Sequence, residues 1–105
     1  KIRKFRDARD WQQFHNHKDM AVSIVVEAAE LLEHFQWSRG TTEAHIAAHK
    51  KEIGEEIADV AIYLFELADN LGLDIKSLIE EKLAHNERKY PVERAKGSDK
   101  KYTEL

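Results

Sequence analysis

Two short acidic motifs, each inside an apolar and strongly helical stretch, constrain the fold of this chain more than any other feature. Glu27 and Glu30 form the first pair, and Glu56 and Asp59 form the second. Side chains three residues apart on a helix project from the same side, so each pair forms an acidic seam along its helix. Carboxylates are rarely buried unless they are paired or bind a metal, so two such helices packed together would need a partner for their seams.

The alternative for each seam is the solvated face of an amphipathic helix, the usual environment of charged helical residues. Two matching seams favour instead an arrangement in which the helices face one another. Four carboxylates that face one another repel strongly, and a cation between them would relieve this repulsion. Because all ligands would be oxygen atoms, Mg²⁺ is the expected ion, with Mn²⁺ as a substitute.

The composition indicates a single globular domain. The chain has 105 residues, 35% of them charged, with a net charge of −3 and no cysteine. Disulfides and thiolate metal sites are therefore excluded. The chain has neither the basic, aromatic-interleaved face of a nucleic-acid binder nor an apolar run of the roughly 20 residues that span a membrane. With no recognisable signal peptide, we expect a cytoplasmic protein that binds neither nucleic acid nor membranes.

Apolar residues at helical spacing predict an all-α fold with four main helices and no strand. We expect the first helix over residues 1–15, where aromatic and apolar side chains recur every three residues. The second helix is expected to begin at Asp19 as N-cap and to run to about Trp37. Residues 38–41 are expected to form a turn.

The third and fourth helices have clearer boundaries. Thr42 is the expected N-cap of the third helix, which is long, has a candidate break at Gly54 and ends before Gly72. Asp74 is the expected N-cap of the fourth helix. This helix must end before Pro91, which disfavours helical geometry at the residue preceding it.

These boundaries define one domain and a tail. Residues 1–91 are expected to form a four-helix bundle-type domain, and residues 92–105 a basic tail that is flexible or contacts substrate or a partner subunit. The helices are apolar on more sides than single neighbours can cover, which favours self-association into a dimer or a dimer of dimers. A monomeric four-helix bundle is the alternative.

The fourth helix carries a basic seam, which consists of Lys82, His85, Asn86 and Lys89 on one side of the helix. On its own this seam would be a solvated face. Beside acidic seams that hold divalent cations, its lysines and amide would instead neutralise phosphate oxygens. Phosphoryl chemistry depends mainly on such positioning and charge stabilisation.

Four aromatic side chains suit a nucleotide base, namely Trp11, Phe14, Trp37 and Tyr63. Each is also a candidate core residue. Trp11 and Trp37 are the better candidates for a binding role because both lie near expected helix ends, where a pocket can open. His15 is placed to hydrogen-bond a base, although it and His34 would also be ordinary as surface histidines.

The pattern of E-x-x-E, 25 residues and E-x-x-D resembles the signature of the MazG-like nucleotide pyrophosphohydrolases, an all-α family. Flanking residues are similar to the dCTP pyrophosphatase branch of that family and cover nearly the whole chain: Arg9-Asp10-Trp11, Gln13-Phe14-His15, Phe35-Gln36-Trp37, Lys82, Asn86, Tyr90-Pro91 and Lys101-Tyr102-Thr103-Glu104-Leu105. The resemblance implies Mg²⁺-dependent hydrolysis of a nucleoside triphosphate to the monophosphate and pyrophosphate. It also implies a role in the house-cleaning of nucleotide pools, with control of the normal pools as the alternative.

The resemblance further implies roles for individual residues. The metal ligands would be Glu27, Glu30, Glu56 and Asp59. A separate hypothesis, motivated by the two seams, is that one of these carboxylates, with Glu30 preferred, accepts a proton from the attacking water. Contacts to the phosphates and sugar would come from Lys82, Asn86, Lys89 and Tyr90, and the base pocket from Trp11, His15, Trp37 and Tyr63. The family implies homotetramers with the active site near a subunit interface. One residue departs from the branch, because Ile2 stands where a histidine is expected.

Three other interpretations differ in what they require. A ferritin-like di-metal protein needs Glu-x-x-His pairs, and this sequence has none. A helical dimerisation or regulatory module would use the acidic seams only as solvated or interhelical charge and would show neither metal dependence nor saturable nucleotide binding. A phosphoribosyl-ATP pyrophosphohydrolase would be a structural cousin, but the tryptophans and the tail favour deoxynucleotides such as dCTP.

Overall fold

The computed structural model describes residues 1–37 and 41–105, and every regular element in this part of the chain is a helix. The predicted all-α class is therefore confirmed. The chain divides into two compact units, Lys1–Gly72 and Leu73–Leu105, which we describe separately. The turn predicted at residues 38–41 lies almost entirely outside the described residues.

The predicted first helix is in fact two pieces. Helix α1 spans Ile2–Ala8, and the 3₁₀ helix η1 spans Trp11–Phe14. Between them Asp10 adopts a left-handed backbone with φ of 53°, a conformation that aspartate tolerates better than most residues. The side chain of Gln13 donates to the carbonyl oxygen of Asp10 at 3.0 Å and stabilises this turn. The prediction of one helix over residues 1–15 was wrong because helical spacing of apolar residues does not reveal a single reversed φ.

Helix α2 spans His17–Glu33 and begins three residues earlier than predicted. Its N-cap is Asn16, whose Oδ1 accepts from the backbone N–H of Asp19 at 2.8 Å. Asn16 Nδ2 in turn donates to Asp19 Oδ2 at 2.7 Å, so the two side chains cap the helix reciprocally. Asp19 is thus the third helical residue and not the cap. The helix ends at Glu33 and does not reach Trp37.

Helix α3 spans Glu43–Asn70 and is continuous through Gly54, where we expected a candidate break. Its start and end are as predicted. The Thr42 side chain accepts from His45 N–H at 3.2 Å, and Gly72 follows the helix with φ of 70°, the left-handed conformation that glycine adopts without strain.

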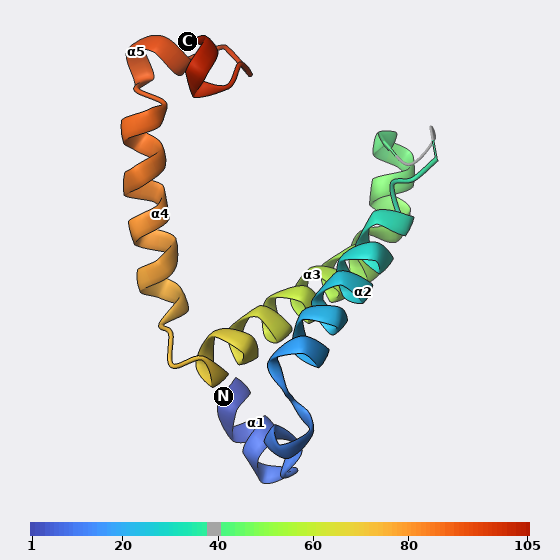
Figure 1. Cartoon of the computed structure of the whole chain (residues 1–105). Coiled ribbons are helices and arrows are strands. Elements are labelled where there is room, and N and C mark those ends of the chain that lie inside the picture. Colours follow the sequence, from blue (N-terminus) through green and yellow to red (C-terminus); the bar gives the residue numbers. More distant parts are fainter. Residues whose placement is uncertain (38–40) are drawn as a thin grey trace. The chain divides into compact units, whose positions relative to one another are not determined.

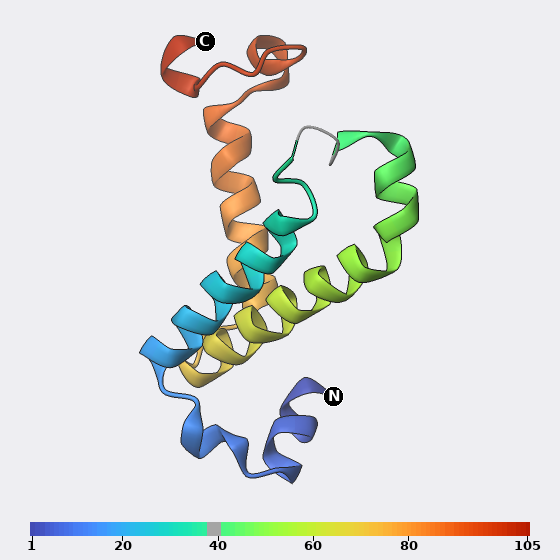
Figure 2. The ribbon, with the colours of Figure 1, turned by 90° about the vertical axis from the view of Figure 1, so that its right-hand side faces the viewer.

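Helices α2 and α3 lie side by side and run in opposite directions (Figures 1 and 2), and their contacts dominate the first unit. Little apolar surface is fully buried: Met20 and Ala68 are the buried hydrophobic residues in the described part of the chain. Other apolar side chains of these helices stay open, including Val25 at 68% and Leu32 at 62% exposure.

A polar network joins α1 to the end of α3. Arg6, which is only 2% exposed, donates from Nε to Asp7 and from Nη1 to both Asp69 Oδ2 at 3.1 Å and Asn70 Oδ1 at 3.0 Å. Arg3 adds three further bonds to Asp69, from Nη2 to Oδ1 at 2.7 Å and from Nε to Oδ1 at 3.1 Å and to Oδ2 at 3.3 Å. These bonds fix the N-terminal segment against a helix end that is more than 60 residues away in sequence.

The second unit consists of α4 (Ile75–Lys89), the short α5 (Val92–Ala95) and the 3₁₀ helix η3 (Tyr102–Glu104). Asp74 caps α4 as predicted, since its carboxylate accepts from Ser77 N–H at 3.2 Å. Within this unit the ring of Tyr102 packs edge-on against that of Tyr90, with centroids 6.1 Å apart, and Lys89 Nζ lies 4.6 Å from the Tyr102 ring centroid. Across the described residues of both units, no helix is both long and apolar enough to traverse a membrane.

Candidate functional site

Three of the four predicted metal ligands lie together between α2 and α3. Glu27, Glu30 and Glu56 each offer a carboxylate oxygen, and these oxygen atoms all lie within 4.8 Å of one another. All three residues are half-buried. The i and i+3 spacing of the first pair puts both carboxylates on the side of α2 that faces α3.

A cation would stabilise the acidic cluster formed by Glu27, Glu30 and Glu56. Burial, followed by the charge of Glu30, raises the pKa of Glu27 above its ordinary value. Burial, hydrogen bonding with Glu30 and the charges of Glu30 and Asp59 raise the pKa of Glu56. Glu27 Oε2 and Glu56 Oε2 are buried with no hydrogen-bond partner. Unpartnered carboxylate oxygens at this separation fit the coordination sphere of a hard divalent cation, so the acidic cluster is suited to bind a metal ion.

Asp59, the fourth predicted ligand, is exposed and lies outside this tight group. It follows Glu56 by three residues on α3, so both carboxylates project from the same side of the helix, and its charge contributes to the raised pKa of Glu27 and of Glu56. Asp59 also lines a neighbouring cavity. It therefore connects the acidic cluster to that cavity.

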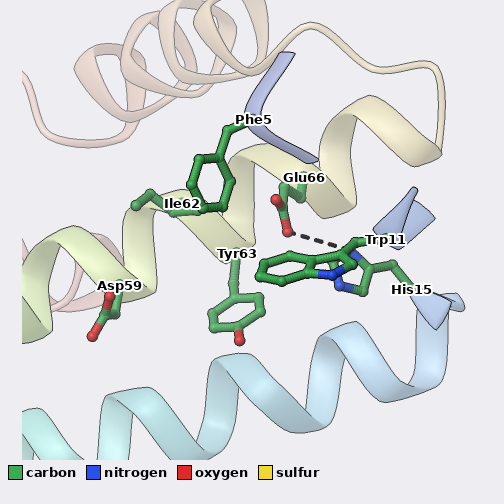
Figure 3. A pocket seen from close by; sticks show the side chains of 7 residues that line it. All are labelled: Phe5, Trp11, His15, Asp59, Ile62, Tyr63 and Glu66. Carbon is green, nitrogen blue, oxygen red and sulfur yellow. Dashed lines mark ion pairs between the residues drawn. The ribbon is translucent and has the colours of Figure 1, made fainter. Parts of the chain in front are cut away.

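The cavity has a volume of about 260 Å³ and lies where η1 and the segment after it meet α3 (Figure 3). Its lining is Phe5, Trp11, His15, Asp59, Ile62, Tyr63 and Glu66. Such a lining, mostly aromatic and apolar with a few polar groups, is typical of a small-molecule site.

The N-terminal segment holds the cavity wall in place. The left-handed turn at Asp10 brings Trp11 beside Phe5, with the rings packed edge to face at a centroid distance of 5.7 Å. Asn70 Nδ2 donates to the carbonyl oxygen of His15 at 3.1 Å, and the same Asn70 accepts from Arg6. The polar network described above thus fixes the position of His15.

The polar groups in the cavity are close to one another. Glu66 is only 4% exposed, and its Oε2 lies 3.5 Å from Nδ1 of His15. Figure 3 shows the Glu66 carboxylate pointing toward His15, with Trp11 and Tyr63 beside them. Burial, and then the charges of Glu27, Glu66 and Asp59, raise the pKa of Tyr63 and keep its hydroxyl protonated.

The structure brings together only part of the residue set implied by the resemblance. Trp11, His15 and Tyr63 line one cavity together with Asp59. Trp37 does not line it and is 73% exposed, beyond the far end of α2.

The remaining predicted contacts are all in the second unit: Lys82, Asn86, Lys89 and Tyr90. Lys82 is exposed on α4, and Asn86 is half-buried one turn later on the same side. His85 lies among these groups, and the charge of Lys89, then burial and then Lys82 lower its pKa. Lys82, His85, Asn86 and Lys89 thus share one side of α4, and their contact with a substrate stays a prediction.

Sequence reasoning missed three residues of the cavity, namely Phe5, Ile62 and Glu66. A signal for Glu66 was present. It follows Tyr63 by three residues and Asp59 by seven, so it continues the acidic seam of α3, and it lies within the apolar run Leu64-Phe65-Glu66-Leu67-Ala68. Phe5 was used only as one of the regularly spaced apolar residues that predicted a helix over residues 1–15. Its position in the cavity wall depends on the turn at Asp10.

The sequence model of the MazG-like family matches residues 22–105. The chain belongs to the MazG-like family. Among members with a curated description, it is 38% identical to dCTP pyrophosphatase 1 of Mus musculus and 36% identical to that of Homo sapiens. Each alignment covers 97% of this chain but 62% of the relative, so the chain spans less than two thirds of the length of these mammalian proteins.

A solved structure is also similar to this chain. A pyrophosphatase from Archaeoglobus fulgidus superimposes with a TM-score of 0.78 and 47% sequence identity. The superposition covers 86% of this chain and 85% of the archaeal one.

Proposed function

We propose that this MazG-like protein is a nucleoside triphosphate pyrophosphohydrolase that converts a (d)NTP and water to the (d)NMP and pyrophosphate. The observation that carries the proposal is the arrangement of Glu27, Glu30 and Glu56 next to an aromatic cavity that Asp59 connects to them. Support comes from the mammalian relatives described as dCTP pyrophosphatases and from the archaeal structure described as a pyrophosphatase. Deoxynucleotides such as dCTP are the proposed substrates.

Mg²⁺, with Mn²⁺ as a substitute, is the proposed cofactor, held by Glu27, Glu30, Glu56 and Asp59. When bound, it would supply positive charge to the triphosphate and to the developing transition state. The buried oxygens of Glu27 and Glu56 support this assignment because, within the described residues, neither has a hydrogen-bond partner.

Each group of residues would have a defined role in the reaction. Glu30 would accept a proton from the water that attacks the α-phosphorus, and the bond from this phosphorus to the bridging oxygen of pyrophosphate would break. Trp11, His15 and Tyr63 would hold the base in the cavity, and the resemblance adds Trp37 to them. By the same resemblance Lys82, Asn86, Lys89 and Tyr90 would contact the phosphates and sugar, where fixed positive charge and amide donors would stabilise the leaving pyrophosphate.

Homo-oligomerisation is a further part of the proposal. Val22, Val25, Leu32, Ile57 and Leu64 are each at least 42% exposed on α2 and α3, which is more apolar surface than such helices usually leave in water. A second copy of the chain is the proposed cover, in a dimer or a tetramer. Cytoplasmic house-cleaning of nucleotide pools is the proposed role of this assembly.

The test is a product assay on the purified chain with Mg²⁺ and a panel of dNTPs and NTPs, in which pyrophosphate is resolved from inorganic phosphate. We expect monophosphate and pyrophosphate, abolished by EDTA and by Glu56→Gln. The neighbouring exposed residue provides the matched control, and Glu55→Gln should keep activity. Nucleoside diphosphate and inorganic phosphate as products would refute the cleavage position, and no turnover of any nucleotide would favour the non-catalytic helical module.

A further inference from the structure

Glu66 is a buried carboxylate that lines the cavity without an adequate partner. Its side chain is 5% exposed, and its nearest ionisable group is Nδ1 of His15 at 3.5 Å. That separation is longer than a good hydrogen bond, and His15 Nδ1 is itself buried without a hydrogen-bond partner. Two polar groups that face one cavity are thus poorly satisfied, which in a folded protein calls for an explanation.

Among the described residues, no arginine or lysine forms an ion pair with Glu66, and His15 is its one ion-pair partner. One turn further along α3, Asp69 forms ion pairs with both Arg3 and Arg6. Arg9 is also occupied, because its guanidinium lies 3.7 Å from the Phe5 ring centroid and donates to the Phe5 carbonyl. The nearby arginines therefore stabilise other groups, and the Glu66 carboxylate is available to bind a ligand that enters the cavity.

We propose that Glu66 is a specificity-determining residue that accepts a hydrogen bond from an exocyclic amino group of the substrate base. This inference rests on the proposed function and adds a residue to it. The ligand class is a nucleotide whose base carries an amino group, such as cytosine, in preference to a base with a carbonyl at the same position, such as uracil or thymine.

The preference follows from the chemistry of a carboxylate, which accepts hydrogen bonds and cannot donate them when ionised. An amino group offers it N–H donors. A carbonyl oxygen at that position would place lone pairs against a buried negative charge and leave both groups unsatisfied. His15 Nδ1 lies 3.5 Å from Oε2 of Glu66, so the other carboxylate oxygen is left for the base.

The first experiment compares kcat/KM for dCTP and dUTP, which differ at this edge of the base, in the wild-type chain and in Glu66→Gln. The wild type should prefer dCTP. Because a glutamine amide can donate to a carbonyl, Glu66→Gln should lower the dCTP-to-dUTP ratio by about 10- to 100-fold, the factor of one hydrogen bond to a charged group. Glu55→Gln, an exposed change of the same kind on α3, should leave the ratio unchanged.

A substrate series in the wild-type chain tests the same idea without any variant. The third substrate is the 2-pyrimidinone deoxynucleoside triphosphate, which has hydrogen in place of the amino group of dCTP. The expected order of kcat/KM is dCTP, then the pyrimidinone, then dUTP, and this series decides alone if Glu66→Gln fails to fold by circular dichroism.

Two results would overturn the inference while the proposed function stands: equal turnover of the three substrates, or a dCTP-to-dUTP ratio that Glu66→Gln does not change. Absence of turnover with every nucleotide would instead remove the proposed function, and this inference with it. The two failures are therefore distinguishable in one set of assays.

Discussion

Arg3 and Arg6 both form ion pairs with Asp69, but one arginine is exposed and the other is buried. This difference makes them a matched pair for a stability experiment. The side chain of Arg3 is 62% exposed and that of Arg6 only 2%. We consider Arg3→Met and Arg6→Met, because methionine keeps the apolar stem of arginine and removes the guanidinium. The two variants then differ mainly in the environment of the lost charge.

The loss in Arg6→Met should be much the larger. Removing one partner of a buried ion pair typically costs about 3–5 kcal/mol, and the lower end applies here because Arg3 still neutralises Asp69. A loss of about 3 kcal/mol corresponds to a fall in Tm of about 12 °C, at about 4 °C per kcal/mol for a chain of this size. Arg3→Met should lower Tm by less than half as much, since water replaces an exposed ion pair efficiently.

The assay is urea and thermal unfolding of both variants and the wild type at low salt. One protein concentration is used throughout, because the proposed self-association would make stability depend on concentration. Near-equal losses would refute the reasoning, because the cost would then come from the shared partner Asp69 and not from burial. A larger loss in Arg3→Met would also contradict it.

Three further predictions concern charge and base binding. Mg²⁺ should raise Tm of the wild type and of Glu55→Gln but not of Glu56→Gln, in a thermal-shift titration; an equal rise in all three would exclude Glu56 as a ligand. Hydrogen bonding to Arg3, then to Arg6, lowers the pKa of Asp69 in the folded state. On acidification the Asp69 carboxylate is therefore protonated at a higher pH in the unfolded chain than in the folded one. The difference in free energy of unfolding between wild type and Asp69→Asn should have its full value above about pH 4 and become smaller below it. A difference that does not change with pH in urea titrations would contradict this assignment. Trp11→Leu should raise KM for nucleotides by about 10-fold through lost stacking, whereas Phe14→Leu, outside the cavity, should not.

Local signals predicted the helix boundaries that depend on single side chains. Thr42, Asp74 and Gly72 act as expected, because a cap needs only a short-range hydrogen bond or one permissive φ. The same reasoning chose Asp19 over Asn16, since both residue types cap helices well and sequence alone does not show which one has an extended backbone.

The acidic cluster was predictable and the cavity only partly so. Helical spacing brought Glu27, Glu30 and Glu56 to facing sides because the geometry of a helix is regular over many residues. The position of His15 beside Glu66 depends instead on the turn at Asp10 and on Asn70, 55 residues away from the carbonyl it binds. Such long-range bonds leave no periodic pattern in the sequence.

The continuity of α3 has a consequence for how this chain can vary in length. Glu56, Asp59, Tyr63 and Glu66 recur every three or four residues on one uninterrupted helix. At about 1.5 Å per residue, the ends of this series lie about 15 Å apart along the axis, and each added residue would rotate all later side chains by about 100°. A single insertion or deletion between Glu56 and Glu66 would therefore turn one end of the series away from the other, whereas substitutions would leave the spacing intact. Changes in chain length should be tolerated only outside this segment, and base preference can change within it by replacement alone.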